Sequence, residues 1–416
     1  MKASDVEELS VLEGELESMH KKGRVYQKLG ASGIFVLKDK TLVEAETKRK
    51  LAAVREIHMI ATATFSLLSV VTWSIIRFTV WGPTISVWTY RTQLSHDLLQ
   101  FMATCSAFPI LHQVNQACLE YWPRLAQYIN PSREPLTQFQ IPQYQLTEAD
   151  VERAGMWSNK LRAISHPPLG IDAECTSPIS DTSQYIVLYV HGGAYTMGSA
   201  RQYRSIHIQM ARASQMRVLG FSYRLAPTHT YPVPLYDAYM AYKHVRYMGY
   251  ADTQIVVAGD SAGGNLALAL WQLTRATFHA LVLFSPRVDV VSFRQSWKTY
   301  NHIDILQAYD IQDPVSPIHQ LLVPNNKSLS DLDVLSDPFV APIHADFTGL
   351  PPTLVQMGGA EVMGDDIQEF TKRARMQGAH IELQVYDNMF HVFQASLPKT
   401  QHLDEAWDNV HAFLHS

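Results

Sequence analysis

The second half of the chain alternates short apolar runs with helical stretches. From about residue 180 onward, six runs rich in β-branched and aromatic residues recur: YIVLYV, MRVLGFSY, QIVVAG, HALVLFS, PTLVQM and HIELQVYD. Strands that alternate with helices predict a mainly parallel sheet with helices on both faces. In such a sheet we expect the chemistry at the carboxyl ends of the strands.

Composition narrows the functional classes. A chain of 416 residues with 47% hydrophobic residues can bury a large core, in one big domain with an appendage or in two domains. Its net charge of -5 provides no basic surface for nucleic acid. Cys105, Cys118 and Cys175 show no CxxC spacing and cannot form a disulfide framework, so we expect core residues or one bridge.

An uncharged run near the N-terminus predicts a membrane anchor. Residues 1–57 are charged and mixed, whereas residues 59–76 have only Ser and Thr as polar members, a length at the lower edge of a membrane span. We therefore expect a single-pass anchor over 58–80. A core helix or a helix lying in the membrane interface is the alternative. A cleavable signal peptide is not expected, because the run begins too far along the chain.

The charges that flank this run predict its orientation. Only Arg77 and Arg91 follow it closely, whereas four basic residues precede it: Lys48, Arg49, Lys50 and Arg55. Positive charge accumulates on the cytosolic side of membrane anchors, so we expect the N-terminus in the cytosol and the rest of the chain on the far side. A glycosylation sequon at Asn326 fits a lumenal domain.

The remaining sequence divides into two parts. The segment before the alternating pattern has helical character, and its last portion, NPSREPLTQFQIPQ, has the polar and proline-rich composition of a linker. The expected organisation is therefore a cytosolic segment (1–57), an anchor (58–80), a helical linker or cap (81–150) and a catalytic domain (151–416).

Two glycine-containing motifs follow predicted strands. HGGAY, residues 191–195, follows YIVLYV, and adjacent glycines let backbone N–H groups face a cavity, although a GG pair alone is more often a turn. GDSAGGN, residues 259–265, follows QIVVAG and precedes the helical LALALWQLT. This is G-x-S-x-G between a strand and a helix, the context of a nucleophile elbow with Ser261 at its apex.

A serine nucleophile needs a histidine and a carboxylate further along the chain. His391 lies in NMFHVF, beyond the last predicted strand, and the acid is expected just after PTLVQM, in GGAEVMGDD. Glu361, Asp365 and Asp366 are the carboxylates there, and the two aspartates also suit the first turn of a helix. Asp387 lies near His391 in the sequence, where a turn role is the simpler interpretation.

Five motifs in this order resemble the hormone-sensitive lipase group of α/β-hydrolases: HGGAY, YRLAP, YPVPLYDA, GDSAGGN and FHVF. The resemblance covers roughly residues 180–415. It implies an α/β-hydrolase fold, a mainly parallel sheet with helices on both faces and a helical cap. It also implies that Ser261 is the nucleophile and His391 the general base, with an oxyanion hole formed by the amides of Gly192, Gly193 and Ala262.

The same resemblance implies supporting roles. His191 and Asp260 are expected to hold the loops of the site, and Asp237 to place a helix. The group commonly has Glu after YRLAP, where this chain has Thr228, so a polar contact near the site is expected to be missing.

The acid is the second departure from the group. The typical Asp-Pro-x-x-Asp, whose first Asp is catalytic, corresponds here to EVMGD. The match assigns the catalytic position to Glu361, and a glutamate serves as the third triad member in other α/β-hydrolases. Asp365 is the alternative acid.

The predicted activity is carboxylic ester hydrolysis without a metal or organic cofactor. An anchored hydrolase of this kind resembles the arylacetamide deacetylases and the steryl deacetylases of the endoplasmic reticulum. The resemblance implies removal of an acetyl group from a lipophilic compound such as a steryl acetate, with residues 287–340 and the helices before 150 as a cap. Its partners would be that small ester and the membrane, not nucleic acid, and the oligomeric state is open.

Two other functions remain open at this point. One is hydrolysis of amides, formamides or medium-chain lipids by the same family. The other is a non-enzymatic small-molecule receptor similar to the gibberellin receptors, which have lost the triad histidine. The presence of His391 argues against the receptor.

Overall fold

The computed structural model describes residues 24–29 and 34–39 as backbone, and residues 97, 134–291, 294–306, 316–322, 332–395 and 402–416. The expected anchor at 58–80 and the sequon at Asn326 lie outside these ranges, as do Cys105 and Cys118. Cys175 is a buried free thiol. Among the described residues, no helix is both long and apolar enough to cross a bilayer.

The chain forms two compact units, Met1–Leu68 and Ser69–Ser416. The first contains two antiparallel strands, β1 (Arg24–Leu29) and β2 (Ile34–Asp39), in a segment for which the sequence suggested only mixed, charged character. All the other described elements belong to the second unit.

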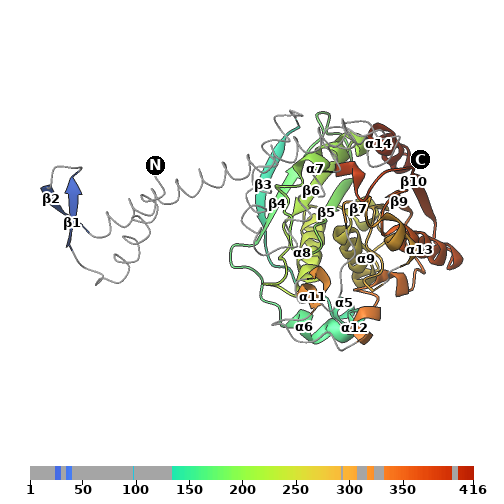
Figure 1. Ribbon diagram of the computed structural model, residues 1–416, viewed down its shortest axis with the longest axis horizontal. Helices are drawn as coiled ribbons and strands as arrows, with labels where there is room; N and C mark the ends of the chain where they lie inside the picture. Colours follow the sequence, from blue (N-terminus) through green and yellow to red (C-terminus); the bar gives the residue numbers. More distant parts are fainter. Residues whose placement is uncertain are drawn as a thin grey trace. The chain divides into compact units, whose positions relative to one another are not determined.

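The second unit is built on an eight-stranded sheet in the order β10-β9-β8-β7-β5-β6-β4-β3 (Figure 1). Every pair from β10 to β6 is parallel, and only the pairs β6–β4 and β4–β3 are antiparallel. The six parallel strands are β5 (Ile186–Val190), β6 (Arg217–Phe221), β7 (Ile255–Asp260), β8 (Ala280–Phe284), β9 (Thr353–Gly358) and β10 (Ile381–Tyr386). These are the six runs identified in the sequence, so the prediction of a mainly parallel sheet is confirmed.

The antiparallel edge was not foreseen. β3 (Leu136–Ile141) lies in the stretch that the sequence assigned to a linker, and it pairs with β4 (Ile171–Thr176). Only Ile141 is fully buried in β3, while Gln138 and Gln140 bond across to carboxylates of β4. A strand stabilised by polar pairing at a sheet edge carries little of the apolar pattern that marks a buried strand.

Helices cover both faces of this sheet, as β5 illustrates. Its side chains alternate: Ile186, Leu188 and Val190 join the core under α8 (Val233–Tyr247), α9 (Ala262–Thr274) and α13 (Gly364–Met376). Val187 and Tyr189 join the core under α7 (Arg204–Ser214) and α14 (Leu403–Leu414) on the other face. A central strand that is buried on both faces must be apolar throughout, which explains the uninterrupted IVLYV.

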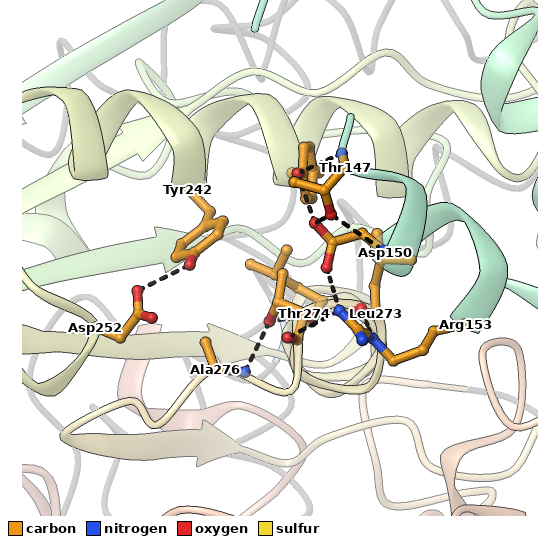
Figure 2. A network of polar contacts seen from close by, with 10 residues as sticks. Thr147, Asp150, Arg153, Tyr242, Asp252, Leu273, Thr274 and Ala276 are labelled. Carbon is orange, nitrogen blue, oxygen red and sulfur yellow. Dashed lines mark hydrogen bonds and ion pairs between the residues drawn. The ribbon is translucent and has the colours of Figure 1, made fainter. Parts of the chain in front are cut away.

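A polar network fixes α5 (Glu148–Arg153) on the core helices (Figure 2). Thr147 caps α5 by accepting a hydrogen bond from the amide of Asp150, 3.1 Å away. The hydroxyl of Tyr239 on α8 donates to the Asp150 carboxylate over 2.7 Å, and the Arg153 guanidinium donates to the Leu273 carbonyl of α9 over 2.7 Å. These bonds attach α5 to α8 and α9.

Short helices connect the remaining segments. They are α6 (Ser158–Arg162), α10 (Gln295–Tyr300), α11 (Pro317–Leu322) and α12 (Leu332–Ser336), with 3-10 turns at η2 (Gly155–Trp157), η3 (Asp252–Gln254), η5 (Pro342–His344) and η6 (Phe393–Ala395).

Within the expected cap segment 287–340, Val290, Ile318 and Leu335 are buried in the main core. Its role in covering the site stays a prediction.

Candidate active site

Ser261 occupies a sharp turn between β7 and α9. Its backbone has φ 51° and ψ -118°, in a region that residues with a side chain rarely adopt. The flanking glycines permit this turn, because a Cβ on Gly259 would lie 2.6 Å from the Gly263 carbonyl oxygen and one on Gly263 would lie 2.1 Å from that of Val190. The result is the strand–turn–helix geometry that projects a nucleophile from the edge of a sheet.

His391 approaches Ser261 from the loop that follows β10. Its Nε2 lies 2.9 Å from Oγ of Ser261, within hydrogen-bond distance. The imidazole is almost completely buried, whereas Ser261 remains partly exposed. The structure therefore brings together a hydroxyl that a substrate can reach and a base that can take its proton.

Glu361 lies behind His391, just after β9. Its Oε1 is 3.7 Å from Nδ1 of His391, which is within ion-pair range but longer than a direct hydrogen bond. Its Oε2 accepts hydrogen bonds from the Ser285 hydroxyl at 2.6 Å and from the Gly358 amide at 2.9 Å. Contacts of this kind are often long without substrate and shorten in the reacting complex.

The neighbouring aspartates contact other groups. Asp365, in the first turn of α13, accepts a hydrogen bond from the Ser296 amide of α10 at 2.8 Å. Asp366 forms an ion pair with Arg294 at 2.8 Å and accepts the indole N–H of Trp297. Asp387 is exposed at the surface. Glu361 is thus the carboxylate beside Nδ1 of His391.

The carboxylates around His391 set its protonation. Burial lowers the pKa of His391, but the interaction with the Glu361 carboxylate, together with the charges of Asp304 and Asp260, outweighs burial and raises it. This environment stabilises the imidazolium that forms when a serine proton is transferred to it.

The HGGAY loop is anchored by Asp260. This buried carboxylate accepts hydrogen bonds from the Gly192 amide at 3.0 Å and from the hydroxyls of Tyr189 and Tyr203 at 3.0 and 3.2 Å. Burial raises the pKa of Asp260 to about 6, although the three donors oppose the shift. The amide of Gly192, expected at the oxyanion hole, is therefore directed at Asp260, because a buried carboxylate needs such donors.

The other two expected oxyanion donors are the amides of Gly193 and Ala262, and Ala262 directly follows Ser261. Gly193 has φ 108°, so only a glycine fits there without strain, and a Cβ would meet the Met197 carbonyl oxygen at 2.2 Å. Ala262 is the first residue of α9, where helix geometry leaves the amide without an intrahelical acceptor. Backbone N–H groups of this kind can donate hydrogen bonds to an anion.

The remaining family-derived residues contact the scaffold. His191 stacks on Tyr223 with ring centroids 4.1 Å apart, and burial lowers its pKa to about 4, so this imidazole is neutral. Asp237 on α8 forms an ion pair with Arg224 at 2.7 Å and accepts its backbone amide. Thr228 is exposed.

Two buried residues that contact Glu361 or the His391 loop were not predicted from the sequence. Ser285, with φ 44°, ends the β8 run; its hydroxyl donates to Glu361 and accepts the Val392 amide at 3.1 Å. Its position at the carboxyl end of a predicted strand could have indicated a role in the site. Asp304 accepts the amide of His391 at 2.9 Å, but it stands alone in NHIDIL and no motif marked it.

The chain is similar in sequence to known proteins. Residues 187–395 match the family model for the alpha/beta hydrolase fold. An esterase of Acinetobacter venetianus is 32% identical over 213 residues, which cover 50% of this chain and 67% of that protein. An acetyl-hydrolase of Streptomyces hygroscopicus is 31% identical over 232 residues, 55% of this chain and 74% of that protein.

Solved structures show the same relationship. A crystal structure of an esterase from the bacterial hormone-sensitive lipase family superposes with a TM-score of 0.59 at 27% identity, covering 77% of this chain and 97% of that one. The chain belongs to the α/β-hydrolase family. Within that family it is a member of the hormone-sensitive lipase group.

Proposed function

We propose that this protein removes a short acyl group, an acetyl in the first place, from a lipophilic alcohol, with Ser261, His391 and Glu361 as its triad. The broad part of this statement follows from the esterase relatives and structural neighbours: the chain is a carboxylic ester hydrolase. The observation that carries the proposal is the 2.9 Å approach of His391 Nε2 to Ser261 Oγ at a strained, partly exposed turn.

The proposed reaction proceeds in two halves. Ser261 Oγ attacks the ester carbonyl while its proton passes to Nε2 of His391, and Glu361 offsets the charge of the imidazolium. The amides of Gly193 and Ala262 donate to the oxyanion, and Gly192 holds the loop through Asp260. His391 then protonates the departing alkoxide, and water, activated by the same imidazole, releases the acid from the acyl-enzyme.

The acetyl preference is the narrower part of the proposal. It is supported by the acetyl-hydrolase among the relatives and by the resemblance to deacetylases of lipophilic compounds. A carboxylesterase/phospholipase of Mycobacterium tuberculosis is 31% identical over 224 residues, 53% of this chain and 58% of that protein. That relative supports a lipid hydrolase as the second candidate.

Two measurements test the proposal. A fluorophosphonate probe should label the parent protein and fail to label Ser261→Ala, whereas the control Ser214→Ala, a buried serine of α7, should be labelled like the parent. Hydrolysis of p-nitrophenyl acetate, butyrate and palmitate then ranks the acyl groups. A folded parent that takes no label would refute the serine mechanism, and a clear preference for palmitate would favour the lipid hydrolase.

We also propose that residues 58–80 anchor the protein in the membrane of the endoplasmic reticulum, with the N-terminus in the cytosol. The support is the uncharged run 59–76 with its basic residues on the N-terminal side. Protease protection on intact microsomes is the test. The catalytic unit should resist digestion until detergent is added, and its digestion without detergent would overturn the lumenal assignment.

A further inference from the structure

Asp304 connects the two loops that carry Glu361 and His391. It lies in the turn after α10, and its side chain is completely buried. One carboxylate oxygen, Oδ1, accepts the backbone amide of His391 at 2.9 Å, and the other, Oδ2, accepts the amide of Val362 at 2.8 Å. Because Val362 directly follows Glu361, one carboxylate holds the backbone of both loops.

This arrangement requires a carboxylate. Each of the two amides presents an N–H, so the group between them must offer two acceptors. The amide group of an asparagine offers one acceptor, and its NH2 would face an N–H across the other contact. A glutamate would keep the charge, but its additional methylene would shift one loop relative to the other. Asp304 is therefore matched to this position in both charge and length.

Asp304 also acts on His391 through its charge. The charged groups around the imidazole are Glu361 after β9, Asp260 at the end of β7 and Asp304 after α10. Burial raises the pKa of Asp304 to about 6, and its carboxylate in turn contributes to the raised pKa of His391. Loss of this negative charge should lower the pKa of His391.

We propose that Asp304 is a positioning residue for the reaction: by binding the amides of His391 and Val362 together, it holds the imidazole at the distance from Glu361 and Ser261 that catalysis needs. This inference rests on the proposed function and deepens it. A positioning role differs from a purely structural one in one respect. The carboxylate that fixes the spacing of the two loops also adds negative charge near the imidazole of His391.

The test compares Asp304→Asn with the matched control Asp337→Asn. Asp337 likewise accepts a backbone amide, that of Phe339 at 2.9 Å, but it does so next to α12. For p-nitrophenyl acetate, Asp304→Asn should lower kcat about 10- to 100-fold with little change in KM, because a misplaced base affects the chemical step. Its acid limb of kcat/KM should move to lower pH, and Asp337→Asn should behave like the parent.

A conservative variant separates charge from spacing. Asp304→Glu should keep the acid limb near that of the parent while kcat still falls. A folded Asp304→Asn with parental kcat would overturn the proposal. A loss of kcat with an unmoved acid limb would overturn it as well, since a merely structural contact gives that result.

If Asp304→Asn does not fold, or if the parent has no esterase activity, amide hydrogen exchange on the parent tests the positioning role of Asp304. The amides of Val362 and His391 should be protected near neutral pH and should lose protection together near pH 5, where Asp304 is protonated. The Ser261 amide, bonded to the Phe284 carbonyl, is the internal reference. Unprotected loop amides at neutral pH would refute the positioning role, whereas absence of hydrolysis alone would refute only the proposed function.

Discussion

Nε2 of His391 lies 2.9 Å from Oγ of Ser261 although 130 residues separate them in the chain. Ser261 follows β7 and His391 follows β10, and the strands β8 and β9 lie between them in the sheet. The loop after β10 must therefore pass back over the ends of both intervening strands. The end of β9 presents Glu361 to this loop and the end of β8 presents Ser285, so the order of strands in the sheet brings these groups close to Ser261.

Replacement of the two candidate acids should have unequal effects. Glu361→Gln should lower kcat by about 10²- to 10⁴-fold, because an amide neither fixes the imidazole tautomer nor offsets its charge. Asp365→Asn should change kcat less than about tenfold, because the amide oxygen can still accept the Ser296 N–H at the start of α13. Ester hydrolysis by the two purified, folded variants measures this, and the reverse order would transfer the role to Asp365.

Ser285→Ala should impair catalysis by removing a hydrogen bond to Glu361. It removes the donor to Oε2 of Glu361 and leaves the Val392 amide without its acceptor, so we expect a loss of about 1–3 kcal/mol in the free energy of unfolding and a reduced kcat. Ser214→Ala is the control, since that buried hydroxyl accepts the Met216 amide on the other face of the sheet. The control should lose stability without loss of kcat. Denaturant unfolding and kcat together separate the two, and an unchanged kcat in Ser285→Ala would remove it from the site.

The parallel sheet was predictable because its strands are buried on both faces. β5, β7, β8 and β9 are buried at every position, and such strands consist mostly of successive apolar residues. Ser261 was predictable for a similar reason: its turn needs Gly259 and Gly263, and these small residues leave a local motif.

The residues that escaped prediction act through tertiary contacts. Asp304 binds the amides of Val362 and His391, 58 and 87 residues away, and no local pattern reports such a contact. The Gly192 amide was expected at the oxyanion hole, but it donates to Asp260. This contact also escaped prediction because its acceptor is 68 residues away in the chain. β3 was hidden since it is stabilised at an edge by polar pairing.

The tight turn at the nucleophile makes a further prediction. Gly263→Ala should destabilise the protein by about 3 kcal/mol, because the new Cβ would meet the carbonyl oxygen of Val190, a backbone atom that cannot move without disrupting β5. Gly364→Ala is the control: the nearest atom to its Cβ would be the flexible end of Met357, 3.0 Å away. Thermal unfolding should rank Gly263→Ala far below Gly364→Ala, and equal stability of the two would contradict the elbow geometry.

His207 on α7 should make the protein sensitive to acid. Its ring is fully buried, in T-shaped contact with Tyr189, and among the described residues neither ring nitrogen has a hydrogen-bond partner. Burial, with smaller contributions from His191 and Arg204, lowers its pKa from 6.5 to about 3. The folded state therefore holds the neutral imidazole, whereas the unfolded chain takes up a proton below pH 6.5. The contribution of His207 to the free energy of unfolding is complete above pH 6.5 and is lost as the pH falls toward 3.

The variant His207→Leu isolates this effect. Between pH 7 and pH 5 the parent should lose about 2 kcal/mol through His207, since each pKa unit corresponds to about 1.4 kcal/mol. His207→Leu lacks the titrating group, so its free energy of unfolding should fall less over the same interval, whatever its stability at pH 7. His302→Leu, at an exposed position, should keep the parental pH dependence. Urea unfolding at both pH values measures the difference, and parallel losses in parent and His207→Leu would show that the imidazole is not buried in its neutral form.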